Sequence, residues 1–218
     1  MKDEKETRRK LLESAKKEFG EKGFLQASLR NICKNAGVTT GALYFFFRDK
    51  DDLFVSLVKE PLLKVYAIMQ EHFQSEKDGA QKGMLLNEDY SQDVNTALRI
   101  VHELYQHREE FLLLLTKAQG SSLENVTDHI ADISNEHYRT LGKAFEEKFP
   151  DWRMKEQFIH WIAHMQTDIF IYAVTHIETE EEAKQYMRQA VSYLICGWYG
   201  MFGKVVEPLK EDESTTIE

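Results

Sequence analysis

Along most of this chain, apolar residues recur at steps of three and four, which is the period of an amphipathic α-helix. The first such stripe consists of Leu11, Leu12, Ala15 and Phe19. It predicts a helix from about Thr7 to Gly20, ended by Gly20 and Gly23. Because only 3 prolines and 11 glycines interrupt 218 residues, the whole pattern favours an all-α fold.

Two short helices joined by a tight turn are expected next. Ser28 is a good N-cap for a helix over Leu29–Ala36, since its hydroxyl can accept a hydrogen bond from a first-turn amide. Gly37 ends that helix, and Thr39 can cap a third helix that ends near Phe47. This is the helix-turn-helix arrangement, which places its second helix in the major groove of DNA.

A fourth helix is expected to begin at about residues 49–50 and to continue towards Phe73. Pro61 lies within it, and proline lacks an amide donor and clashes with the preceding turn. We therefore expect either a kink near Leu57–Pro61 or a helix break that leaves Pro61 in a first turn. Residues 75–91 have weak periodicity and two glycines, which predicts a loop with at most one short helical piece.

The remainder of the chain predicts five more helices and a polar tail. The helices are expected at about Gln92–His107, Glu109–Ala118, Leu123–Lys148, Trp152–His176 and Glu180–Val206. Residues 208–218 are acidic and have almost nothing to bury, so we expect disorder there. The expected organisation is a helix-turn-helix domain over residues 1–50, a larger helical domain over residues 51–207, and this tail.

Charge is distributed unevenly between these two domains. The net charge of −9 argues by itself against a nucleic-acid partner. However, residues 1–50 carry 12 Lys and Arg against 7 Asp and Glu, a net of +5, whereas residues 51–218 carry 16 against 30, a net of −14. A basic module joined to an acidic remainder is expected when only the module meets a polyanion.

Several other function classes are disfavoured. The first residues lack the apolar segment of a signal peptide and the longest apolar run, Phe111–Leu115, is too short to span a bilayer, so a cytoplasmic location is expected. Cys33 and Cys196 are interpreted as reduced core residues, because neither has a second Cys or a His at metal spacing. No catalytic triad, Cys/His pair or phosphate-binding glycine loop is evident, so we expect neither an enzyme nor a cofactor.

One histidine arrangement is compatible with a metal. His160, His164 and Asp168 follow at four-residue steps, so they share one helix face, and two imidazoles at that spacing can hold one ion. With no further ligand nearby, a solvated or hydrogen-bonded stripe is the default interpretation.

The segment SLRNICKNAGVTTGALYFFFRDKDDLF, residues 28–54, resembles the helix-turn-helix of the TetR family of bacterial transcriptional repressors. The family pattern is roughly T-x-x-x-I-A-x-x-A-G-V-S-x-G-[TA]-L-Y-x-[HY]-F-x-[SN]-K-x-x-L. The Gly-Val turn, the Gly-x-Leu-Tyr step, the Phe and the Lys all stand at matching positions. The resemblance covers about a quarter of the chain and implies a DNA-binding regulator.

What the resemblance implies for individual residues concerns DNA contact. Tyr44 and Lys50 align with phosphate-binding positions, Ser28 could donate to a phosphate as well as cap its helix, and Arg48 could add a backbone contact. The positions from which the family commonly reads bases or touches thymine methyls are Arg30, Thr39, Thr40, Gly41 and Phe45. Of these, Arg30 is the expected hydrogen-bonding reader, since a guanidinium can address guanine with two bonds.

One position departs from the family pattern. Many members have His or Tyr where this chain has Phe46, which cannot donate a hydrogen bond to phosphate. Phe46 is therefore expected either to contact DNA without such a bond or to pack on the surface of its own domain.

The two long final helices are apolar on more than one face and must pack against two partners. In the family they pair with their copies across a two-fold axis, which implies a homodimer that reads a palindrome. The expected interface residues are Phe158, Ile162, Ile169, Leu194, Gly197, Trp198 and Met201. The alternative is a bundle within one chain.

A cavity for a small-molecule effector is expected in the larger domain, because aromatic, Met and polar residues are mixed on its helices. The candidate ligand-binding residues are Tyr66, Met69, His102, Tyr105, Phe111, His129, Trp161, His164, Met165 and Tyr172. Each of them could equally be an ordinary core or surface residue.

The expected function is that of a repressor released from a palindromic DNA operator by a small molecule. Two alternatives stay open. One is a ligand-binding or scaffold protein with a vestigial helix-turn-helix, and the other is an activator or a regulator with no effector.

Overall fold

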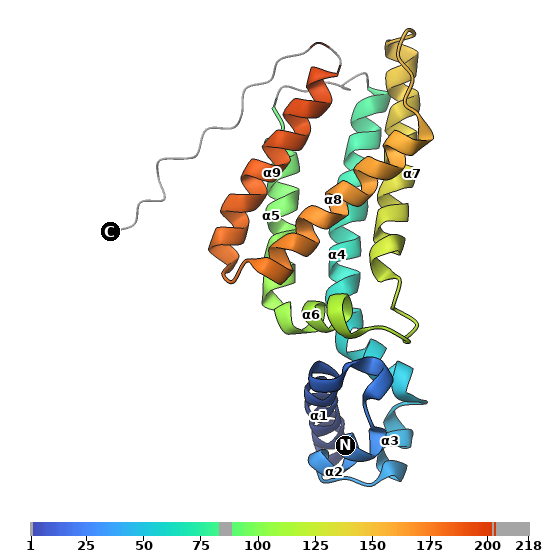
Figure 1. Ribbon diagram of the computed structural model, residues 1–218, viewed down its shortest axis with the longest axis vertical. Coiled ribbons are helices and arrows are strands. Elements are labelled where there is room, and N and C mark those ends of the chain that lie inside the picture. The colour runs from blue at the N-terminus through green and yellow to red at the C-terminus, as the bar shows by residue number, and fades with distance from the viewer. Residues whose placement is uncertain (1, 83–88, 202, 204–218) are drawn as a thin grey trace, which may run out of the picture.

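The computed structural model of the chain describes residues 2–82, 89–201 and 203, and within these the regular structure is entirely α-helical. A small N-terminal domain contains the first three helices and a larger body contains the rest (Figure 1). The helices are α1 (Lys2–Gln26), α2 (Leu29–Ala36), α3 (Thr40–Phe46), α4 (Lys50–Gln81), α5 (Ser91–Gln106), α6 (Arg108–Lys117), α7 (Val126–Lys148), α8 (Glu156–His176) and α9 (Glu180–Gly200). The predicted all-α class is confirmed.

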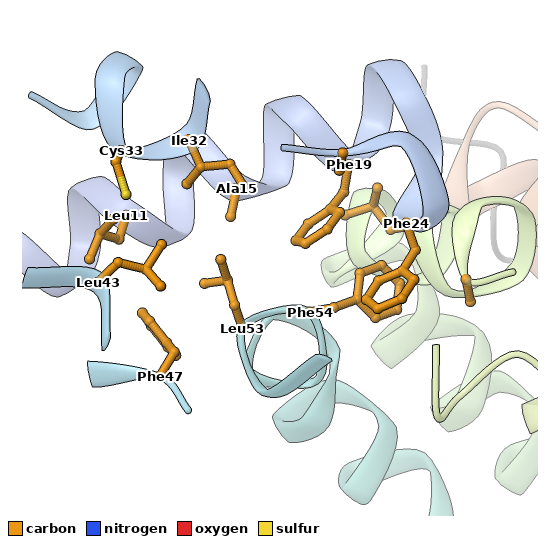
Figure 2. Close-up of a cluster of buried hydrophobic side chains, with 13 residues drawn as sticks. Leu11, Ala15, Phe19, Phe24, Ile32, Cys33, Leu43, Phe47, Leu53 and Phe54 are labelled. Atoms are coloured by element: carbon orange, nitrogen blue, oxygen red, sulfur yellow. The ribbon is translucent and has the colours of Figure 1, made fainter. Parts of the chain in front are cut away.

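The N-terminal domain has a compact apolar core built mainly by side chains of α1 to α4, and α6 adds Leu113 to it (Figure 2). Phe19, Phe24 and Phe54 meet there, with ring centroids 5.1 to 5.9 Å apart. Leu43 of α3 and Cys33 of α2 are buried in the same core, so Cys33 is the small core residue that the sequence predicted. This core holds α2 and α3 in place at the end of the molecule that points away from the body (Figure 1).

In the body, α4, α5, α7, α8 and α9 lie lengthwise or obliquely beside one another, and α6 lies below them, next to the N-terminal domain (Figure 1). Val58, Leu62 and Val65 bring α4 into the main apolar cluster. A second cluster joins α5 to α8 and α9 around Val101, Ala173 and Met187. Within the described residues, no helix combines the length and apolarity needed to cross a membrane.

Several predicted helix boundaries are wrong. The first helix begins at Lys2 and passes Gly20, and only at Gly23, where φ is +73°, does its backbone leave the helical conformation. α4 runs through Pro61 without a break and continues to Gln81, where the sequence predicted a loop. The predicted tail at 208–218 lies outside the described residues.

The loop prediction failed for the last turns of α4 because of the residue types found there. Past Phe73, the side chains of α4 that line the interior are polar or small, namely Ser75, Glu76, Gly79 and Ala80. Hydrophobic periodicity therefore disappears although the helix does not. The domain boundary predicted at residue 50 falls at the start of α4, whose first turns supply Leu53 and Phe54 to the N-terminal core.

Candidate functional sites

The turn between α2 and α3 is fixed by side-chain caps and one glycine. The Ser28 hydroxyl accepts a hydrogen bond from the Asn31 amide at 3.4 Å, and the Thr39 hydroxyl accepts one from the Ala42 amide at 3.2 Å. Gly37 has a φ of +69°, the left-handed conformation that glycine adopts without a Cβ clash. Both caps and the glycine are thus used as the sequence predicted.

The solvent face of α3 combines hydroxyls with exposed aromatic rings. Thr39, Thr40 and Gly41 are exposed at its first turn. Tyr44 and Phe45 follow with exposed fractions of 57% and 72%, although a large buried core lies directly behind them. These two adjacent rings form an exposed apolar surface on α3, and leaving them in water forgoes the stabilisation that burial would give.

The remaining rings of this helix face inward. Phe47 is buried in the domain core, with the Arg8 guanidinium 5.4 Å from its ring centroid. Phe46 is partly buried against the same core, and its ring lies edge-on to Phe45 at 5.0 Å. In this structure Phe46 therefore packs on its own domain, which is one of the two alternatives left open by the sequence.

The basic residues predicted to contact DNA differ in their surroundings. Arg30 of α2 and Arg48, which follows α3, are exposed, and the Arg48 guanidinium is 3.5 Å from a carboxylate oxygen of Asp52. Lys50 instead donates to the carbonyl oxygens of Leu25 at 3.1 Å and Ala27 at 3.4 Å. Its ammonium thus ties the start of α4 to the segment after α1, in addition to any contact with phosphate.

A buried carboxylate that the sequence did not single out supports the start of α2. Glu18 is 4% exposed and accepts hydrogen bonds from the Ser28 amide at 3.1 Å and from the Asn31 side chain at 3.3 Å. Lys22 donates to the same carboxylate at 2.8 Å. The hydrogen bond from Lys22 outweighs the effect of burial and holds the pKa of Glu18 below its ordinary value.

The body encloses a largely apolar cavity of about 370 Å³, which is within the size range of small-molecule sites. Its walls come from all six helices α4 to α9, and Leu62, Ile100, Leu114 and Phe170 are among its apolar residues. Of the predicted ligand-binding residues, Met69 and Phe111 line it. The others lie elsewhere.

Their positions show what they do instead. The Tyr105 hydroxyl donates to the carbonyl oxygens of Ala173 and Ile177 at 2.9 Å each, and the His102 ring pairs with Glu180 at 2.9 Å. The ring of Tyr66 packs edge-on against that of His129. Tyr172 is exposed and stacks on His176. The ring centroid of His164 lies 4.5 Å from that of His160. Trp161 and Met165 line a groove between α8 and α9.

One end of the cavity carries a polar cluster that the sequence analysis missed. His72 and Glu76 of α4, Asp93 of α5 and His137 of α7 converge there, and all four line the cavity. Burial raises the pKa of Asp93 to about 7, helped by the negative charge of Glu76, and burial lowers the pKa of His72. The sequence does not reveal the cluster, because His72 and Glu76 alone are a common helical pair and only the packing of three separate helices brings Asp93 and His137 to them.

The groove between α8 and α9 collects most of the residues predicted for a dimer interface. Phe158, Ile162, Leu194, Gly197, Trp198 and Met201 line it, whereas Ile169 lines the cavity and not the groove. Trp161 and Tyr193 add rings that are 55% and 76% exposed, and a Cβ added at Gly197 would meet nothing within 4 Å. Cys196, predicted in the core, is half-buried in this groove.

α6 connects the cavity to the N-terminal domain. Phe111 and Leu114 line the cavity, whereas Leu113, between them in sequence, is buried in the N-terminal core. Lys16 of α1 bridges to Glu109 at 2.5 Å and to Glu110 at 2.9 Å. α6 therefore contacts both the cavity and the N-terminal domain. A shift of this helix at the cavity wall acts directly on the domain that carries α3.

Comparisons with known proteins agree on the class of this fold. Residues 11–57 match the family model described as "Bacterial regulatory proteins, tetR family". The HTH-type transcriptional regulator AcrR of Shigella flexneri is 30% identical over 202 residues, covering 88% of this chain and 91% of that protein. The fatty acid metabolism regulator protein of Bacillus subtilis is 27% identical over 114 residues, covering 50% of this chain and 59% of that protein, so the chain spans less than two thirds of this relative.

Among solved structures, a transcriptional regulator from Aquifex aeolicus VF5 superimposes with a TM-score of 0.54 at 18% identity. The match covers 86% of this chain and 99% of that one. At this identity the likeness bears on the fold alone, and it extends through both the N-terminal domain and the body.

Proposed function

The chain belongs to the tetR family of bacterial regulatory proteins, and we propose that it represses transcription by binding a palindromic operator as a homodimer and leaves it when a small molecule enters the cavity. Membership confirms the regulator class that the sequence predicted, as against an enzyme. The observation that carries the proposal is the exposed face of α3, held at the end of the molecule away from the body.

The chemistry of that face suits the major groove of DNA. Thr39, Thr40 and Gly41 are short and uncharged, so the helix can approach base edges without stripping water from a charge. Tyr44 and Phe45 are both exposed, so we expect the Tyr44 hydroxyl to donate to a phosphate and the Phe45 ring to contact a thymine methyl group. Arg30 supplies hydrogen bonds for base reading, and Ser28, Arg48 and Lys50 supply further backbone contacts. The same role implies a cytoplasmic protein.

The groove between α8 and α9 is proposed to hold a second copy of the chain. Two exposed rings, Trp161 and Tyr193, stand on it, and Gly197 leaves room for close backbone approach. Dimerisation also serves the readout, since two α3 helices related by a two-fold axis address two half-sites of a palindrome.

Release is proposed to act through α6. A ligand that packs against Phe111 and Leu114 favours a different position of this helix, and Leu113 and the Lys16 bridges pass the change to the N-terminal domain. The α3 helices of the dimer then no longer match the spacing of the half-sites. An amphipathic or aromatic molecule suits a cavity that is apolar along most of its wall and polar at one end.

DNA binding tests the proposal. Fluorescence anisotropy of a labelled fragment from the region upstream of the gene, recorded at two salt concentrations, is expected to show specific binding that weakens steeply with salt. Tyr44→Ala is expected to weaken binding to all sequences, whereas Tyr172→Ala, which removes an exposed ring of the body, is the matched control. Binding that ignores sequence, or equal affinity for Tyr44→Ala and wild type, would favour a vestigial helix-turn-helix.

A further inference from the structure

The polar end of the cavity has the composition of a transition-metal site. His72 and Glu76 lie one turn apart on α4 and so share a face, and Asp93 reaches them from the first turn of α5. Their side chains are 13%, 32% and 30% exposed, and all three line the cavity, so they can be reached from it. A cluster of this kind is not required to close an apolar core.

The distances between these side chains fit a metal ion. His72 Nε2 lies 3.3 Å from Glu76 Oε2 and 3.5 Å from Asp93 Oδ1, and the three ligand atoms are all within 4.8 Å of one another. Zinc binds nitrogen and oxygen at roughly 2.0–2.2 Å, so the ligand atoms of a tetrahedral site stand about 3.3 Å apart. The two distances from His72 Nε2 are therefore close to the tetrahedral value, and all three residues line the cavity, from which a further ligand could approach.

Neighbouring groups orient the histidine for this role. The Thr96 hydroxyl donates its hydrogen to the Gln92 carbonyl oxygen at 2.9 Å, so towards His72 Nδ1, 3.4 Å away, it acts as an acceptor. In the tautomer that carries the ring proton on Nδ1, this hydroxyl accepts it and Nε2 presents its lone pair to the two carboxylates. With both carboxylates ionised, three acceptors face one another in that state, an arrangement that a shared cation satisfies.

The fourth polar side chain supports the carboxylate. His137 Nε2 donates to Glu76 Oε2 at 2.7 Å, and its ring is stacked on Phe73 at 3.9 Å with the planes 7° apart. Hydrogen bonds of this sort to ligating carboxylates are usual around protein metal sites, because they fix the direction of the ligand atoms.

We propose that His72, Glu76 and Asp93 bind one divalent transition-metal ion of the zinc type, with its remaining coordination position open to the cavity. The imidazole favours such an ion over Mg²⁺ or Ca²⁺, which prefer oxygen ligands throughout. The ion would join α4 to α5 at the wall of the cavity. This site goes beyond the proposed repression and does not depend on it, since metal binding is measured without DNA.

Cobalt provides a direct test, because Co²⁺ in a four-coordinate site of nitrogen and oxygen ligands absorbs visible light strongly. The untagged full-length chain, stripped with EDTA and dialysed, is titrated with Co²⁺, and bound Co²⁺ is then displaced with Zn²⁺. We expect about one ion per chain. His72→Gln and the isosteric Asp93→Asn are each expected to weaken binding by roughly tenfold or more, with unchanged helical circular dichroism.

The control is the other histidine pair of the chain. His160 and His164 lie 4.5 Å apart on α8, and the double variant His160→Gln/His164→Gln is expected to bind Co²⁺ like wild type. The proposal is overturned if the wild type binds no Co²⁺, if folded Asp93→Asn binds it equally well, or if the α8 double variant loses it. Each result leaves the DNA-binding proposal standing, because α3 lies in the other domain.

Discussion

Glu18 is expected to stabilise the helix-turn-helix by holding the start of α2, and Glu18→Ala should expose that contribution. The substitution leaves the Ser28 amide and the Asn31 side chain without their acceptor. An orphaned polar group costs about 1–3 kcal/mol, and both groups are partly accessible to water, so the low end applies to each. Lys22 is 40% exposed and regains water at little cost. The expected loss of unfolding free energy is about 2–3 kcal/mol.

Glu18→Gln keeps the shape of the side chain at position 18 and removes its charge, so it shows how much of the stabilisation depends on the charge. An amide oxygen can still accept from the Ser28 amide, so the loss at neutral pH should be about 1 kcal/mol. Because the pKa of Glu18 in the folded state is depressed below its ordinary value of 4.5, its ionised form stabilises the fold above that value. The stabilisation is lost as the pH falls through the folded-state pKa. The difference between wild type and Glu18→Gln should therefore be constant from pH 7 to about 5 and shrink below about 4.5.

Urea denaturation followed by circular dichroism measures these differences, and hydrogen exchange of the α2 amides locates them. Glu21→Ala, which removes an exposed carboxylate from the same helix, is the control and should cost less than about 0.5 kcal/mol. Equal losses for Glu18→Ala and Glu21→Ala would refute the reasoning, as would a Glu18→Gln difference that persists unchanged at pH 3.

Three further predictions concern Lys50, two glycines with positive φ, and the groove between α8 and α9. Lys50→Met should cost about 1–2 kcal/mol in urea denaturation, since two carbonyl oxygens lose their donor and the Phe24 ring loses a cation 4.6 Å away; unchanged stability would leave phosphate binding as its only role. Gly120→Ala and Gly37→Ala should each cost about 1–2 kcal/mol, because both glycines have positive φ and the Leu25 side chain that a Cβ at Gly120 would meet is exposed and can rotate away; melting temperatures equal to that of wild type would contradict this. Tyr193→Glu should halve the molar mass by light scattering, whereas Tyr172→Glu should leave it unchanged; a dimer that persists in Tyr193→Glu would exclude the α8–α9 groove.

The N-terminal domain could be predicted from sequence because its determinants are local. Ser28 and Thr39 cap the helices that follow them, and Gly37 occupies the one left-handed position of the turn. The spacing of Leu43 and Phe47 identifies the buried side of α3 before any tertiary contact is known. Each of these features depends on residues within a few positions of one another.

The cavity could not be predicted in the same way. Tyr105 has an aromatic ring and a polar tip, which suit a ligand contact, but its hydroxyl caps the end of α8 through carbonyl oxygens 68 and 72 residues away. His102 likewise pairs with Glu180 on another helix. A sequence shows that a side chain can form a polar contact, but not whether a ligand or a distant helix end provides the partner.

The polar cluster at the end of the cavity could not be predicted from sequence either. Glu76 lies in a stretch whose weak periodicity predicted a loop, and His137 lies 61 residues further on. Nothing local associates them with Asp93. Only the packing of α4, α5 and α7 brings the three together.

Photo-crosslinking from α3 tests most directly the claim that the exposed face of this helix binds operator DNA. A photoreactive phenylalanine analogue placed at Phe45, which is 72% exposed, is irradiated in a complex with the upstream DNA fragment, and the same analogue at Tyr172 serves as the control. The account predicts crosslinks from position 45 to bases in two symmetric half-sites and none from position 172. A stable, sequence-specific complex that gives no crosslink from position 45 would contradict it.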